Sequence, residues 1–325
     1  DLTNGIKQTD WDNLNNKLNK PLLDRVLSGL YPPGSTLKPF VALAALENNI
    51  RTPPFSIQDH GSYTMPNGSK TFNDWKEGGH GTVDLIKAIT VSCDTFFYGL
   101  GVELGIPKLN KTLRRFGFGK KTQIDIHNER SGLLANEYWK KKRFNQPWYQ
   151  GETAITAIGQ GFTLVTPIQL ALATAKLAKP DITFKPHVLL SIENTIDTNQ
   201  NKYGKGIANT VENSKYLDWV KEGMQNVTRD GGTAAFIGKN ANYKMAAKTG
   251  TAQVFGLKKN QSYDEQSLPD HLKDHALFIA YAPIENPKLA IAVIVENGGH
   301  GGSIAGPIAK KVFDAYLEKE IRKND

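Results

Sequence analysis

Three short polar motifs, separated by long stretches of chain, constrain this sequence more than any other feature. Ser35 and Lys38 lie three residues apart, directly after the stiff turn Pro32-Pro33-Gly34. The segment Ser92-Cys93-Asp94 follows, and Lys248-Thr249-Gly250-Thr251 lies far downstream. A nucleophile with a nearby lysine, a second serine and a strand ending in Lys-Thr-Gly, in this order, form the motif set of a serine acyl-transfer site. A fold that uses this chemistry must bring the three segments together.

The first motif is expected at the start of a helix over residues 34–50. Pro32-Pro33-Gly34 cannot lie inside a helix, whereas residues 41–47 are strong helix formers. Side chains three residues apart share a helix face, so Lys38 is within reach of Ser35 Oγ. Burial and a second cation, for which Lys248 is the candidate, would lower the pKa of Lys38 and let it act as a base. The alternative is that Ser35 only caps the helix and that Lys38 is solvated.

The other two motifs supply a second hydroxyl and a substrate-binding strand. Ser92 precedes an aromatic run and could relay a proton to a leaving amine, or could simply cap the next segment. Lys248-Thr249-Gly250-Thr251 follows small residues that leave room for another backbone, so a peptide could lie along this strand by β-addition. Lys248, Thr249 and Thr251 would then present a cation and two hydroxyls to a carboxylate.

With these motifs the chain resembles the transpeptidase domain of class B penicillin-binding proteins, and within them the elongation-specific penicillin-binding protein 2 branch of Gram-negative rods. The resemblance covers nearly the whole chain. Most members of the family have asparagine at the position of Asp94, and this branch shares the aspartate. Beyond the motifs it rests on Lys142-Arg143-Phe144, Pro147-Trp148-Tyr149-Gln150-Gly151, Gly159-Gln160-Gly161, Thr166-Pro167-Ile168-Gln169, residues 248–256 and Glu296-Asn297-Gly298-Gly299.

The resemblance implies a peptidoglycan D,D-transpeptidase that works during cell elongation and is inhibited by β-lactams. Ser35 would attack the penultimate D-alanine of a stem peptide, Lys38 would be the base and Ser92 the proton relay. Asp94 and Gly250 belong to the substrate site, Lys248, Thr249 and Thr251 would bind the terminal carboxylate, and the N–H groups of Ser35 and Thr251 would form the oxyanion hole. No catalytic cofactor is implied. The implied partners are stem peptides, β-lactams, a membrane glycan polymerase and scaffold proteins of the elongation machinery.

The fold is expected to be α+β, with the penicillin-binding and serine β-lactamase-like transpeptidase architecture. Strands are expected over residues 244–256, 276–283 and 288–296, with a closing helix over 303–321 and a helix that begins at Thr166-Pro167. They predict an antiparallel sheet flanked by helices, and the resemblance adds an all-helical subdomain. Residues 51–82 are polar and rich in Pro and Gly, which suggests a surface excursion, and a strand or two is expected over 183–196.

The 325 residues are interpreted as one transpeptidase domain with an entry arm at residues 1–30. Family members carry an N-terminal membrane anchor and a pedestal domain, and neither is recognised here, since no stretch approaches about 18 apolar residues. We therefore expect a periplasmic domain of an inner-membrane-anchored protein. The net charge of +8 suits acidic neighbours such as anionic lipid or wall polymer. Nucleic acid is not expected, because no recognition motif is present.

The single cysteine excludes an intramolecular disulfide and raises the question of a metal. One interpretation is that Cys93 is a small buried side chain. The other is that Asp59, Asp74, His80 and Cys93 bind a structural Zn²⁺ that fastens the excursion beside Ser92, because thiolate, imidazole and carboxylate are ligands that zinc accepts. His60 is an alternative ligand. The spacing matches no standard zinc motif.

Two other functions are compatible with the same motifs. A serine β-lactamase or D,D-carboxypeptidase would pass the acyl group to water and would need a base to activate that water. Glu152 is the nearest acidic candidate, and it is expected to cap or pack instead. A β-lactam sensor domain would be acylated and would stop there. Slow hydrolysis of the acyl-enzyme would distinguish a transpeptidase from the hydrolases. Acylation alone does not distinguish a transpeptidase from a sensor.

Overall fold

The structure is a computed structural model of the chain, and it describes residues 5–15, 20–181, 185–189, 215–253, 269 and 273–324. The side chains of residues 318–324 are not described. The strand expected over 183–196 and residues 254–256 of the expected strand 244–256 fall largely or wholly outside this part of the chain. Among the described residues, no helix combines the length and the apolar character needed to cross a membrane.

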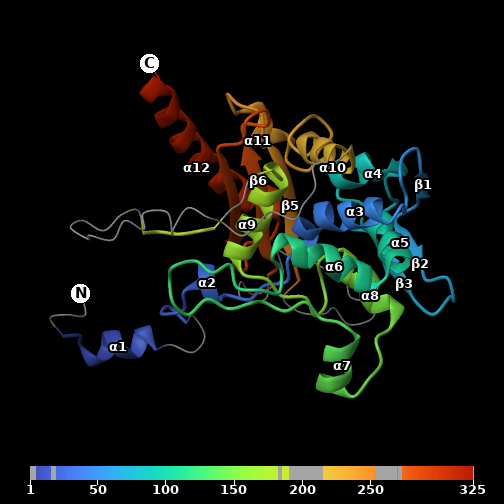
Figure 1. Cartoon of the computed structure of the whole chain (residues 1–325), viewed down its shortest axis with the longest axis horizontal. Coiled ribbons are helices and arrows are strands. Elements are labelled where there is room, and N and C mark those ends of the chain that lie inside the picture. The colour runs from blue at the N-terminus through green and yellow to red at the C-terminus, as the bar shows by residue number, and fades with distance from the viewer. Residues whose placement is uncertain are drawn as a thin grey trace.

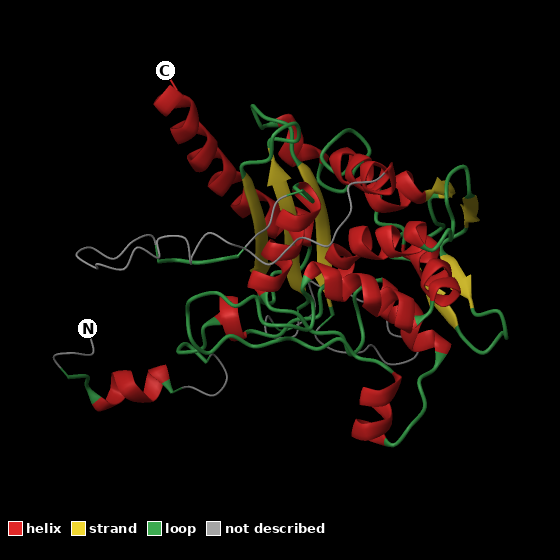
Figure 2. Ribbon diagram, viewed as in Figure 1, coloured by secondary structure: helices red, strands yellow, loops and turns green. Residues whose placement is uncertain are grey.

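A three-stranded antiparallel sheet forms the centre of the molecule (Figures 1 and 2). Its order is β5-β6-β7, with Thr249 opposite Phe278 and Phe278 opposite Val293. The three predicted strands are confirmed; the first and third are shorter than expected, and the second has the expected length but begins one residue earlier. Their bounds are β5 Ala246–Ala252, β6 His275–Ala282 and β7 Leu289–Val295.

The sheet separates two apolar cores because successive side chains of a strand point to opposite faces. On β6, Phe278 and Ala280 pack with Phe313 of the closing helix α12 (Gly301–Asn324). Leu277 and Ile279 belong to the larger core on the other face, which the remaining helices build. Both faces of β6 are therefore buried, and the α+β prediction is confirmed.

The larger core lies in a mainly helical region beside β5. Its central helix α3 (Lys38–Glu47) is buried from Lys38 to Leu46. The helices around it and at the sheet are α4 Leu85–Thr90, α5 Asp94–Leu104, α6 Ile106–Phe116, α8 Gln150–Ala157, α9 Pro167–Ala178 and α10 Lys215–Asn226. The predicted start of α9 is confirmed, since Thr166 and Gln169 form a capping box with Pro167 in the first turn.

The excursion over residues 51–82 and the two residues after it form two antiparallel strand pairs that lie at one end of this region (Figure 1). Strand β1 (Ser56–Asp59) pairs with β4 (Gly81–Asp84), and β2 (Ser62–Thr64) pairs with β3 (Thr71–Asn73). Each of these strands has three or four residues and a single apolar residue, so the run is too short for alternation to indicate a strand. The remaining helices are α1 Gln8–Leu14, α2 Arg25–Ser28, α7 Glu137–Phe144 and α11 Ala235–Lys239.

Candidate active site

Ser35 lies in a 3-10 turn (Gly34–Leu37) that leads directly into α3. The turn is held by Thr36, whose Oγ1 donates to the carbonyl of Pro33 at 2.6 Å. Gly34 has a φ of +53°, and a Cβ there would lie 2.5 Å from the carbonyl oxygen of Thr251. Only glycine allows the turn that carries Ser35 to approach the third motif this closely.

Lys38 joins the first motif to the second. Its side chain is fully buried, and its Nζ donates to Asp94 Oδ1 at 2.6 Å, to the carbonyl of Ser92 at 2.8 Å and to Ser92 Oγ at 3.1 Å. Ser35 Oγ, which is half-buried, makes no hydrogen bond to any described residue. In this arrangement Lys38 bonds to Ser92 and Asp94 rather than to Ser35.

The backbone of Ser92 is held in a conformation that is unusual for a residue with a side chain. Its φ is +60°, which costs roughly 1–3 kcal/mol for a residue other than glycine. Two donors hold the Ser92 carbonyl in this geometry: Lys38 Nζ and Trp75 Nε1, the latter at 3.1 Å. The strain turns the second motif toward Lys38, and Trp75 connects it to the excursion.

Lys248 lies fully buried on β5, with its Nζ donating to the carbonyl of Thr249 at 3.1 Å. Burial lowers the pKa of Lys248 well below its usual value, the positive charge of Lys38 lowers it further, and Asp94 opposes the shift. The sequence predicted that the charge of Lys248 would act on Lys38, whereas the structure shows the charge of Lys38 acting on Lys248. Lys38 itself forms an ion pair with Asp94.

The rest of the third motif lies against two segments that the motifs do not include. A Cβ on Gly250 would lie 2.8 Å from the Thr36 side chain, so this position of β5 touches the Ser35 turn. Thr249 Oγ1 lies 2.8 Å from Thr233 Oγ1, and Gln160 Nε2 donates to the Thr251 carbonyl at 2.9 Å. No pattern in the sequence predicted a role for Thr233.

Asp59, Asp74, His80 and Cys93 form one cluster, as the zinc hypothesis requires. One ligand atom from each lies within 4.8 Å of all the others, and these side chains are buried. Hydrogen bonds from the Gly61 N–H and from His80 outweigh the effect of burial and hold the pKa of Asp59 at about 2. Burial, together with the Asp74 carboxylate, raises the pKa of the Cys93 thiol. The alternative ligand His60 is exposed and lies outside the cluster.

The cluster also contains an unsatisfied polar atom. His80 Nδ1 lies 2.9 Å from Asp59 Oδ2, but His80 Nε2 is buried and has no hydrogen-bond partner in the part of the chain that the structure describes. Asp74 Oδ2 accepts from the N–H of Thr95 in the first turn of α5 at 2.9 Å, and Cys93 caps the same helix. The cluster is therefore connected directly to the backbone that follows Ser92.

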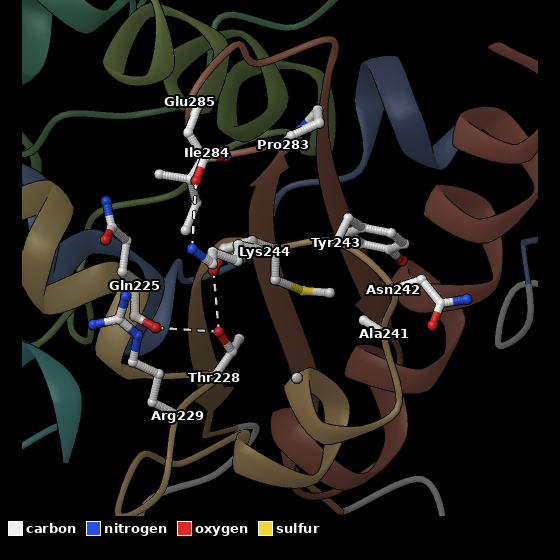
Figure 3. A pocket seen from close by; sticks show the side chains of 12 residues that line it. Gln225, Thr228, Arg229, Ala241, Asn242, Tyr243, Lys244, Pro283, Ile284 and Glu285 are labelled. Atoms are coloured by element: carbon white, nitrogen blue, oxygen red, sulfur yellow. Dashed lines mark hydrogen bonds and ion pairs between the residues drawn. The ribbon is translucent and has the colours of Figure 1, made fainter. Parts of the chain in front are cut away.

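A cavity of about 470 Å³ lies at the start of β5, away from these contacts (Figure 3). In it the hydroxyl of Thr228 donates to the carbonyl of Met245, and the N–H of Ile284 donates to the carbonyl of Lys244. None of the residues of the three motifs lines this cavity. We place the candidate site where the three motifs touch, because Ser35, the two buried lysines and β5 meet there.

Comparison with known proteins shows that the penicillin-binding protein transpeptidase domain matches residues 5–314. The chain belongs to this family. The peptidoglycan D,D-transpeptidase MrdA of Haemophilus influenzae is 42% identical over 324 residues, which make up 98% of this chain and 49% of that protein. The chain thus spans about half the length of this curated relative.

Solved structures of the family agree in fold. PBP2 of Pseudomonas aeruginosa in complex with WCK 5153 is similar with a TM-score of 0.82 and 41% identity, over 96% of this chain and 67% of that chain. PBP2 of Helicobacter pylori in complex with MreC is similar with a TM-score of 0.83 and 37% identity, over 96% of this chain and 54% of that chain. The expected transpeptidase fold is confirmed.

Some contacts of this transpeptidase domain were not anticipated from its sequence. Gly159-Gln160-Gly161 was noted only as part of the resemblance, yet the Gly159 carbonyl accepts from the N–H of Gly34 at 2.9 Å. Glu152 accepts from the N–H of Tyr149 at 2.8 Å and forms an ion pair with the buried Lys140. Its expected capping role is confirmed, and its carboxylate is committed to α8.

Proposed function

We propose that this domain is a serine D,D-transpeptidase that cross-links peptidoglycan stem peptides during cell elongation and is acylated by β-lactams. The observation that carries the proposal is the arrangement of two buried lysines around the second motif. Lys38 bonds to Ser92 and Asp94, and Lys248 lies buried on the strand that touches the Ser35 turn. Membership of the transpeptidase family supports the same reaction.

In the first half-reaction Ser35 Oγ attacks the carbonyl carbon of the penultimate D-alanine while Lys38 takes the hydroxyl proton. Asp94, 2.6 Å from Lys38 Nζ, offers an acceptor for a proton that Lys38 must give up before it can act as a base. The N–H groups of Ser35 and Thr251 hold the oxyanion. Ser92 passes a proton to the departing nitrogen, the C–N bond breaks, and terminal D-alanine leaves. Lys248, Thr249 and Thr251 hold its carboxylate, and Gly250 lets the strand approach Ser35.

In the second half-reaction an amine of a neighbouring stem peptide attacks the acyl-serine ester. The new amide bond forms as the ester C–O bond breaks, and the proton of the amine returns to Ser35 Oγ. One amide bond is broken and one is formed, so the exchange needs no external energy source. Transfer to an amine is favoured over hydrolysis because Glu152, the candidate water-activating base, is engaged by Lys140 and by the N–H of Tyr149.

The test is the intact mass of the wild-type chain and of Ser35→Ala after incubation with a penicillin. We expect one stable adduct per wild-type chain and none in the variant. Consumption of penicillin without an adduct would show a hydrolase instead. A D-alanyl thioester with a D-amino acid acceptor then separates an enzyme, which forms the amide product, from a sensor, which stays acylated.

We further propose that this domain works in the periplasm as part of an inner-membrane-anchored protein, with residues 1–30 as its entry arm. Support comes from the relatives, whose names assign them to peptidoglycan cross-linking, and from the net charge of +8, which suits anionic surroundings. The H. pylori relative forms a complex with MreC, so we propose a scaffold partner of that type together with a membrane glycan polymerase. Titration of the chain with a purified scaffold of this type, followed by light scattering, tests the first contact.

We also propose a structural Zn²⁺ held by Asp59, Asp74, His80 and Cys93. Two observations support this proposal: His80 Nε2 is buried with no hydrogen-bond partner among the described residues, and two carboxylates lie beside a thiol whose pKa is raised by burial and by Asp74. A divalent cation would supply the missing positive charge and favour the thiolate. It would fasten the excursion to the start of α5 and so support Ser92 from behind.

Elemental analysis of protein purified without chelators tests the metal. We expect about one zinc per chain, and a lower melting temperature for Cys93→Ser and for wild-type protein treated with a chelator. An unchanged melting temperature in both cases, or protein free of zinc, would contradict the proposal.

A further inference from the structure

The carbonyl of Thr251 is already occupied before any substrate arrives. Gln160 Nε2 donates to it at 2.9 Å. Gln160 lies between Gly159 and Gly161, whose φ angles of +76° and +83° give this turn a shape that other residues rarely adopt. The Gly159 carbonyl accepts from the Gly34 N–H at 2.9 Å, which fixes the turn beside Ser35. Gln160 is therefore anchored where it meets the Thr251 carbonyl.

This carbonyl lies on the side of β5 that faces away from β6. A Cβ on Gly301 would lie 2.2 Å from both the Gly250 and the Leu277 carbonyl oxygens, which places these two carbonyls in the space between β5 and β6. Along an antiparallel strand the N–H and C=O of one residue point to the same side, and successive residues alternate. The N–H and C=O of Thr251 therefore point away from β6, and β5 is the edge strand of the described sheet.

A peptide added antiparallel to this edge would use both groups with a single residue. In a hydrogen-bonded antiparallel pair, the two residues exchange both N–H···O bonds. If the Thr251 N–H holds the oxyanion, as the proposed function requires, then the N–H of the same substrate residue is aimed at the Thr251 carbonyl. The N–H of the acyl donor and the side chain of Gln160 therefore donate to the same oxygen.

We propose that Gln160 is a specificity-determining residue that competes with the N–H of the attacked residue for the Thr251 carbonyl. Because the Thr251 carbonyl oxygen already accepts a hydrogen bond, a second hydrogen bond from the N–H of the acyl donor stabilises the complex less than it would at a free carbonyl. The chain then accepts acyl donors with and without this N–H at similar rates. The inference rests on the proposed function and adds a rule for which acyl donors the site prefers.

The test compares two acylating agents that differ only at this group: benzylpenicillin and its isostere with a 6β-phenylacetoxy ester in place of the amide. We expect the wild type to be acylated by both with rate constants within about threefold. In Gln160→Leu, which cannot donate, the preference for the amide should rise about five- to tenfold, the value of one neutral hydrogen bond. Gln160→Met serves in the same way if the leucine variant does not fold.

Two controls make the outcome decisive. Gln8→Leu removes a glutamine that also donates to a single oxygen, that of Asp12 at 2.8 Å on α1, and should leave the amide-to-ester ratio unchanged. If Gln160→Leu slows both agents equally or changes neither, Gln160 does not compete for the carbonyl and the inference is overturned. If the wild type is acylated by neither agent, or Ser35→Ala still forms the adduct, the proposed function itself fails.

Discussion

Replacing Gly159 by alanine should lower the acylation rate of the domain far more than it lowers its stability. A Cβ at Gly159 would lie 1.9 Å from the carbonyl oxygen of Gly34, one residue before Ser35. An ordinary contact begins near 3.4 Å, so one of the two turns must move by about 1.5 Å. The neighbouring atoms are backbone, which cannot rotate out of the way. The displacement therefore falls on the turn that carries Ser35 or on the one that carries Gln160.

The expected magnitude follows from these distances. A φ of +76° costs alanine about 1 kcal/mol or slightly more in stability. A displacement of about 1 Å in a reacting group costs about a hundredfold in rate, which is about 2.7 kcal/mol of activation free energy. We therefore expect Gly159→Ala to reduce the second-order rate constant of acylation by about a hundredfold.

The assay is stopped-flow acylation with a fluorescent penicillin, together with the melting temperature of each protein. Gly68→Ala is the matched control, because Gly68 has a similar φ of +67° at the β2–β3 turn but no atom within 4 Å of the added Cβ. It should lose about 1 kcal/mol of stability and keep its acylation rate. Acylation of Gly159→Ala within threefold of the wild type would refute the reasoning that this contact places Ser35.

Two further predictions concern the buried lysines. Lys248→Met should abolish acylation but stabilise the domain by about 1–2 kcal/mol at pH 7, because it removes a buried charge beside Lys38. Since the pKa of Lys248 is lowered in the folded state from its ordinary 10.5, the unfolded state binds more protons between the lowered pKa and 10.5. Wild-type stability should rise with pH over that window and the advantage of the variant should shrink; an equal pH dependence in denaturant titrations at pH 7 and 9.5 would contradict this. Lys140→Met should destabilise the domain by about 3 kcal/mol in urea titrations, because it leaves the Glu152 carboxylate without its partner, and Lys140→Met/Glu152→Gln should recover part of that loss.

Patterns within one segment predicted much of the fold. Alternating and apolar runs located the three strands of the sheet, and the closing helix expected over 303–321 is α12 at Gly301–Asn324. The pair Thr166-Pro167 marked the start of α9 because a capping box is written in four consecutive residues. The strand pairs β1–β4 and β2–β3 were not predicted, since runs of three or four residues are too short for an alternating pattern to indicate a strand.

Residue types and their order predicted the chemistry of the candidate site, but they did not predict its geometry. Local spacing predicted that Ser35 and Lys38 lie close together at the start of a helix. Residue types alone identified a cysteine, a histidine and two aspartates as candidate metal ligands. Only the tertiary structure decided that Lys38 bonds to Ser92 and Asp94, and that Gln160 bonds to Thr251. The partners are 54, 56 and 91 residues apart in the chain. Hydrogen bonds of about 3 Å between such distant residues depend on how the sheet and helices close against one another, and no local pattern in the sequence records that.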